Sequence, residues 1–109
     1  MQIDSCINKI LYSDTYKKSY YEVIDRFIYD YQDEFALNKF LLNHHDALEK
    51  LKYVNAFDGR PSDKTLLELG LRRMKIKRSK YIIIYTYKHG NIWLHSIQYA
   101  SRDFAKVFY

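Results

Sequence analysis

The chain has 109 residues and a net charge of +5, and 48% of its residues are hydrophobic. A chain of this length buries about two-thirds of its unfolded surface, so we expect one domain, residues 1–109. No apolar run approaches the ~20 residues of a membrane span, and the N-terminus lacks the pattern of a secretory signal. With Cys6 as the only cysteine, these features indicate a soluble cytoplasmic protein.

The charge is distributed unevenly along the chain. Residues 1–58 contain 7 basic and 10 acidic side chains, whereas residues 59–109 contain 11 and 3. A basic half on a nearly neutral chain favours an anionic partner, such as nucleic acid or an acidic protein, over a merely solvated basic face. Six cations fall within nine residues, with no acidic residue among them: Arg72, Arg73, Lys75, Lys77, Arg78 and Lys80.

The first half of the chain predicts a strand and a helical hairpin. Residues 5–12 favour a strand, and Ser13-Asp14 offers an N-cap to the helix that follows. Asp33 offers a cap to a second helix, and so short a connection makes the two helices antiparallel neighbours. Apolar residues at three- and four-residue steps predict the buried faces. These are Tyr16, Tyr20, Val23, Ile24, Phe27, Ile28 and Tyr31 in the first helix, and Leu37, Phe40, Leu41, His44, Leu48 and Leu51 in the second.

The second half predicts a three-strand antiparallel meander. Residues 55–62 form a loop, and residues 65–71 fit either a helical turn or the start of a strand. A basic strand begins at Leu71, and the run 81–87 is apolar on both faces, as in a strand covered on both sides. Residues 88–91 suit a hairpin turn before a last strand, 92–99. The fold class is therefore α+β, in the order β-α-α-β-β-β.

Strict alternation along these strands predicts which side chains share a face. In the basic strand, Arg73, Lys75 and Lys77 lie on one side and Arg72, Met74, Ile76 and Arg78 on the other. In the last strand, Ile92, Leu94, Ser96 and Gln98 lie on one side and Trp93, His95, Ile97 and Tyr99 on the other.

This order of elements resembles the RelE/ParE superfamily of toxins from type II toxin–antitoxin pairs. Four blocks in the second half carry the resemblance: Gly59-Arg60-Pro61, Met74-Lys75-Ile76-Lys77, Ser79 to Tyr85, and Ser101-Arg102-Asp103. In the first half, Ala36 to Leu51 resembles the second helix of the family. The match spans nearly the whole chain, and its specificity lies in the order and spacing of the blocks.

The resemblance implies a toxin that arrests growth and is held inactive by an antitoxin protein. The RelE-like branch cleaves mRNA on the ribosome, without a metal or other cofactor, whereas the ParE-like branch inhibits DNA gyrase and is not a nuclease. Such modules also act in plasmid stabilisation. Charge by itself supports a third interpretation, a non-catalytic module that binds RNA or an acidic peptide.

The resemblance also assigns roles to particular residues. Lys75 and Lys77 would be the catalytic strand lysines, and like charges nearby would ease the loss of a proton. Arg102 would hold the scissile phosphate, and either Tyr109 or Tyr99 would stack or transfer a proton, although the tyrosine of the family aligns nearest to Phe108. The remaining cations would bind RNA or the antitoxin: Arg72, Arg73, Arg78 and Lys80.

One position departs from the nuclease pattern. Nuclease members place an arginine directly after the aromatic residue of the third strand, and here Ile82 occupies that position. Loss of one preorganised cation typically costs ~10²–10³ in rate. Ile82 therefore favours the ParE-like branch or a weakened nuclease, while the basic strand and the position of Arg102 favour RNA. The first expectation from the sequence is a toxin that cleaves mRNA on the ribosome, ahead of gyrase inhibition and of non-catalytic binding. Among the histidines, His95 is a candidate general base, and His44 and His45 lack paired metal-ligand spacing.

Overall fold

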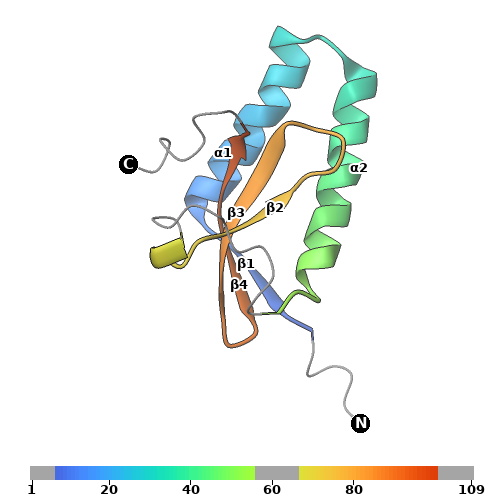
Figure 1. Ribbon diagram of the computed structural model, residues 1–109. Helices are drawn as coiled ribbons and strands as arrows, with labels where there is room; N and C mark the ends of the chain where they lie inside the picture. The colour runs from blue at the N-terminus through green and yellow to red at the C-terminus, as the bar shows by residue number, and fades with distance from the viewer. Residues whose placement is uncertain (1–6, 56–66, 101–109) are drawn as a thin grey trace.

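The computed structural model describes residues 7–55 and 67–100 of the chain. A four-stranded sheet lies against two antiparallel helices, so the predicted α+β class and element order are confirmed (Figure 1). No helix in these two segments is long and apolar enough to cross a membrane. The elements are β1 (Lys9–Tyr12), α1 (Asp14–Asp25), a π-helical turn (Arg26–Asp30), α2 (Glu34–Leu51), β2 (Arg72–Lys75), β3 (Tyr81–Lys88) and β4 (Asn91–Tyr99).

The sheet has the order β1-β4-β3-β2. The strands β2, β3 and β4 form the predicted antiparallel meander, and β1 adds to its far edge parallel to β4. A parallel neighbour requires a long crossover connection, which the helical hairpin between β1 and the meander supplies. The first strand, β1, and the last strand, β4, are therefore neighbours in the sheet.

Helix α1 begins where the sequence predicts. Ser13 is the N-cap, and its Oγ accepts a hydrogen bond from the Tyr16 N–H at 2.9 Å. The same residue also ties the helix to the sheet, because its N–H donates to the Leu94 carbonyl at 3.1 Å and its Oγ to the His95 carbonyl at 3.0 Å. One residue thus terminates β1, begins α1 and fixes both against β4.

A π-helical turn changes the face of the first helix near its end. The Tyr31 N–H donates to the Arg26 carbonyl at 2.9 Å, a step of five residues rather than four. The extra residue rotates the following side chains away from the predicted stripe. Ile28 and Tyr31 are therefore 45% and 51% exposed, and their predicted place in the core is wrong. Phe27 still packs against Phe40.

Helix α2 follows the prediction closely. Gln32 has a φ of 50°, which reverses the chain, and the Asp33 carboxylate accepts from the Ala36 N–H at 2.9 Å as the N-cap. The buried residues of α2 are Phe40, His44, Ala47 and Leu51. Leu41 and Leu48, also predicted for that face, are half-buried against the same core.

The β3–β4 hairpin has a two-residue turn at His89 and Gly90, with φ of 50° and 78°. Positive φ at both positions matches the right-handed twist of the strands, and the predicted turn is confirmed. Further along, Ile84 pairs with Ser96 whereas Tyr85 pairs with Leu94, so β4 carries a bulge at His95. The bulge breaks strict alternation.

The bulge corrects the predicted faces of β4. Ile97 joins the core beside Ile92 and Leu94. Ser96, Gln98 and Trp93 share the other face of the sheet, as their partners on β3 show. Because the bulge adds one residue to β4, the side chains after His95 lie on the opposite faces from those predicted.

A buried histidine lies at the centre of the helical layer. His44 is 7% exposed, and its Nε2 lies 2.5 Å from the Tyr16 hydroxyl. Burial lowers the pKa of His44 to about 4, with His45 a smaller cause, so the ring is neutral at pH 7. Burial also raises the pKa of Tyr16. The Tyr16 hydroxyl therefore donates to an unprotonated nitrogen.

This pair predicts a loss of stability in acid. The pKa of His44 lies below the unfolded value of about 6.5, so its contribution is complete above that pH and disappears as the pH falls towards 4. Urea unfolding should show a decrease of about 2–3 kcal/mol from this residue between pH 7 and pH 4. His44→Gln should lose most of this difference, and His45→Gln should keep it. An unchanged pH dependence in His44→Gln would contradict the assignment.

Candidate functional site

The candidate site is the face of the sheet opposite the two helices, which we call the open face. Cross-strand partners share a face, so its rows follow from the pairing. One row contains Lys75, Ile82 and Gln98, and the next contains Arg73, Ile84 and Ser96. A further row pairs Thr86 with Trp93. The face therefore runs from a basic edge at β2, across an apolar centre on β3, to a polar and aromatic side on β4.

The centre of this face is apolar and buried. Ile82 and Ile84 are 6% and 2% exposed, and Leu71 packs against them. These residues form a cluster separate from the main core under the helices. The position where the nuclease pattern has an arginine is thus occupied by a buried hydrocarbon side chain. No described residue places a charge there.

The cations of the basic run lie on both faces of β2 and in the connection that follows it. Strand β2 ends at Lys75, so the prediction that Lys77 continues the strand is wrong. Lys77, Arg78 and Lys80 belong to the connection to β3, where Arg78 has a φ of 58°. A hydrogen bond of 2.7 Å from the Ser79 hydroxyl to the Ile76 carbonyl closes this turn. A tight turn thus replaces the second half of the predicted basic strand.

Arg72 and Ile76 lie away from the open face. Arg72 pairs with Tyr85, a residue of the helix-covered face, and donates to the Leu71 carbonyl at 3.2 Å. Ile76 is fully buried in the main core. Among the described cations of the run, Arg73 and Lys75 are therefore the two whose pairing places them on the open face.

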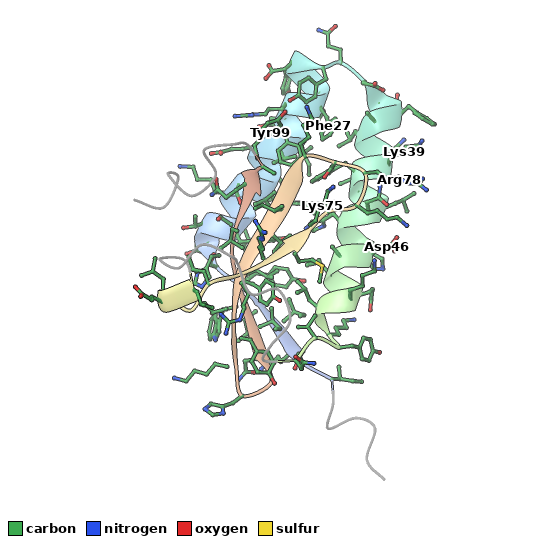
Figure 2. The ribbon with its side chains drawn as sticks, viewed as in Figure 1. Phe27, Lys39, Asp46, Lys75, Arg78 and Tyr99 are labelled. Atoms are coloured by element: carbon green, nitrogen blue, oxygen red, sulfur yellow. The ribbon has the colours of Figure 1, made fainter. Side chains whose placement is uncertain are left out.

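Lys75 and Lys77 also line a shallow groove with one side of α2. Figure 2 shows Lys75 on β2 beside the helix that carries Asp46. The groove is lined by Asn43, Asp46, Ala47, Glu49, Lys50, Lys75 and Lys77. The sequence interpretation expected these lysines in a purely basic cluster. The structure instead places Asp46 and Glu49 in the same groove as the two lysines, because helix α2 runs beside the edge strand.

The far side of the open face contains residues with capacity for stacking and proton transfer. Trp93 is 47% exposed, although its apolar ring would favour burial. His95 Nε2 lies 3.3 Å from the Thr86 hydroxyl, and partial burial lowers the pKa of His95, so the ring is neutral at pH 7. The predicted general base is thus exposed and unprotonated. No sequence motif marked Trp93 as a site residue. Its place on this face follows only from its pairing with Thr86.

The remaining predicted site residues cannot be placed. Arg102 and Tyr109 lie outside the described residues, as do the loop residues 56–66. The geometry of the complete four-residue catalytic set therefore stays a prediction. Within residues 7–55 and 67–100, no three His, Cys, Asp or Glu side chains gather as a metal site.

The fold has a solved counterpart. A chain of the "Chromosomal ParDE TA system from P. aeruginosa" matches with a TM-score of 0.69 at 17% sequence identity, over 87% of this chain and 98% of that one. No protein-family model and no curated protein matches the sequence. At this identity the likeness establishes the fold alone. The expected RelE/ParE-type fold is confirmed, and the activity has to be argued from the site.

The basic edge predicts weak, salt-dependent binding of polyanions. Arg73→Ala combined with Lys75→Ala should weaken binding of a single-stranded RNA oligomer and lower the slope of log affinity against log salt by about one to two. Fluorescence anisotropy at several salt concentrations measures this slope. The matched control combines Lys9→Ala with Lys17→Ala, two exposed lysines on other elements. Equal effects in both double variants would show that only total charge matters.

Proposed function

We propose that this chain is the toxin of a type II toxin–antitoxin pair, and that it arrests growth by binding DNA gyrase rather than by cleaving mRNA. The fold shared with a chain of a ParDE system supports the first part. The cognate antitoxin would be the protein that holds the chain inactive. The chemistry of the open face supports the second part.

The observation that carries this proposal is the buried pair Ile82 and Ile84 at the centre of the open face. RNA cleavage by the 2′-hydroxyl passes through a pentavalent phosphorane, whose developing charge needs preorganised cations. Hydrocarbon side chains supply none and would desolvate a phosphate placed over them. Arg73 and Lys75 border this centre from the edge strand, a position that suits contact with a partner surface.

Ribosome-dependent mRNA cleavage is the second candidate function. The basic edge of the open face favours it, because Arg73 and Lys75 are exposed and adjacent to the centre. Lys75, Lys77, Arg102 and Tyr109 would then share the catalytic roles, with His95 available as an alternative base. A non-catalytic module that binds RNA or an acidic peptide would use the same edge without arresting growth.

The test is brief induction of the protein in bacteria, followed by measurement of growth, plasmid supercoiling and mRNA 5′ ends on the same culture. We expect growth arrest, loss of plasmid supercoiling, and no new 5′ ends within translated mRNA. Purified protein should inhibit supercoiling by purified gyrase. New 5′ ends confined to translated codons, with normal supercoiling, would replace the gyrase proposal with the nuclease. Absence of arrest would favour the non-catalytic module.

Arg102→Ala separates the two mechanisms further. If the protein is a nuclease, removal of a cation that acts in the transition state should lower the cleavage rate by ~10²–10³ or more. A surface that binds a protein spreads its affinity over many contacts, so we expect growth arrest to persist in this variant with a shift of less than about tenfold in the inducer needed. Dose–response curves for growth measure the shift. Complete loss of arrest, with the variant present at the normal level, would contradict the binding mechanism.

A further inference from the structure

A groove of about 380 Å³ lies between α1 and the C-terminal half of β4, along the edge of the sheet. Six of its residues lie at three- and four-residue steps along α1 and the π-helical turn. The others come from the end of β4 and the start of β3. The lining residues are Thr15, Lys18, Ser19, Glu22, Val23, Arg26, Tyr81, Ser96, Ile97, Gln98 and Tyr99.

The groove follows the part of the β4 edge that lies beyond β1. Strand β1 ends at Tyr12, which pairs with Leu94, so within residues 7–55 and 67–100 no strand pairs with the rest of β4 on that side. Within this stretch the Ile97 N–H donates to the Ser19 Oγ at 2.9 Å. The Tyr99 N–H faces the same edge, because N–H groups alternate in direction along a strand. The edge therefore directs a further backbone donor into the groove.

A buried hydroxyl lies at one end of this groove. Tyr81 is 5% exposed, and its hydroxyl has no hydrogen-bond partner among the described residues. The Tyr81 ring contacts Phe27, Phe40 and Tyr99, which hold it in position. Figure 2 shows Tyr99 and Phe27 at this end of the molecule. Native proteins rarely bury a polar group without a partner, since the loss costs about 1–3 kcal/mol.

Two more donors stand beside that hydroxyl. The Tyr31 hydroxyl and the Arg26 guanidinium both interact with that hydroxyl, although neither meets it in full hydrogen-bond geometry, and burial, the largest cause, raises the pKa of Tyr81 to about 12. Tyr81 is therefore protonated near neutral pH and able to donate. Arg26 forms no ion pair within residues 7–55 and 67–100. Several hydrogen-bond donors thus converge at one point, and one of them is a cation that no described carboxylate pairs with.

We infer that this end of the α1–β4 groove binds the carboxylate of a small ligand, with Arg26 and the Tyr81 hydroxyl as its principal donors. The planar guanidinium fits the two oxygens of a carboxylate, and charge-assisted hydrogen bonds are the stronger ones. Glu22 lines the same groove and would repel a dianion, which favours a carboxylate over a phosphate monoester. Glu22 would also accept a hydrogen bond from an amino or hydroxyl group of the ligand.

The inference does not depend on the proposed function, and binding is measured directly on the whole purified chain. Acetate, inorganic phosphate and chloride are titrated at constant ionic strength while the backbone and arginine side-chain N–H signals are followed by NMR. We expect saturable shifts with acetate at the Tyr99 amide and the Arg26 Nε–H, and linear, small shifts with chloride. Tighter saturation by phosphate than by acetate would overturn the assignment to a carboxylate.

Variants test whether these residues form the site. Arg26→Gln and Tyr81→Phe should each weaken acetate binding by about tenfold, since each removes one donor. Arg78→Gln is the matched control, because Arg78 is exposed on the α2 side of the molecule (Figure 2), and it should leave acetate binding unchanged. Glu22→Gln should allow phosphate to bind more tightly.

A structural role alone gives a different pattern. If the Tyr81 hydroxyl merely meets a water molecule, the wild-type chain shows no saturable acetate shift, and Tyr81→Phe changes only the unfolding midpoint. Equal loss of acetate binding in Arg26→Gln and Arg78→Gln would show a general charge effect. Either result would overturn the site. Because none of these measurements involves growth arrest or gyrase, failure here leaves the proposed function to its own test.

Discussion

The burial of β3 on both of its faces is the constraint on which the rest of the structure depends. Tyr81 to Tyr85 are all buried, and the strand pairs with β2 on one side and β4 on the other. Alternate residues therefore belong to two separate apolar clusters. The helices can cover only one of these faces. The role open to each candidate residue on the sheet consequently depends on the face on which its side chain lies.

Adjacent positions on β3 have opposite consequences for chemistry. Ile82 fills the centre of the open face with hydrocarbon, so that face has its cations at an edge rather than over its middle. Tyr81, one residue earlier, projects under the helices and brings its hydroxyl beside Arg26. The same alternation that removes a positive charge from one site supplies a hydrogen-bond donor to the other. The two proposed sites therefore depend on different residues of β3, although Ser96 and Gln98 of β4 border both.

The local elements were predictable because their signals are local. Ser13 and Asp33 cap their helices as expected, and the turn at His89 and Gly90 needs only positive φ. Two of the failures come from single-residue changes of period, and a third from the early end of β2 before Lys77. A π-helical turn rotates Ile28 and Tyr31 out of the core, and the bulge at His95 exchanges the faces of the last strand. Both are changes in backbone hydrogen bonding, which the spacing of apolar residues along the chain does not reveal.

The sequence by itself determined the order of the elements, the antiparallel hairpin and the buried character of β3, because each depends on neighbours along the chain. It also determined that a hydrocarbon side chain stands at position 82. Only the tertiary structure decided that β1 pairs with β4 and stops at Tyr12, so that among the described residues α1, not a strand, borders the rest of that edge. Only it brought Arg26 next to Tyr81 and Lys75 next to α2. These contacts join residues far apart in sequence, and packing, not local preference, selects them.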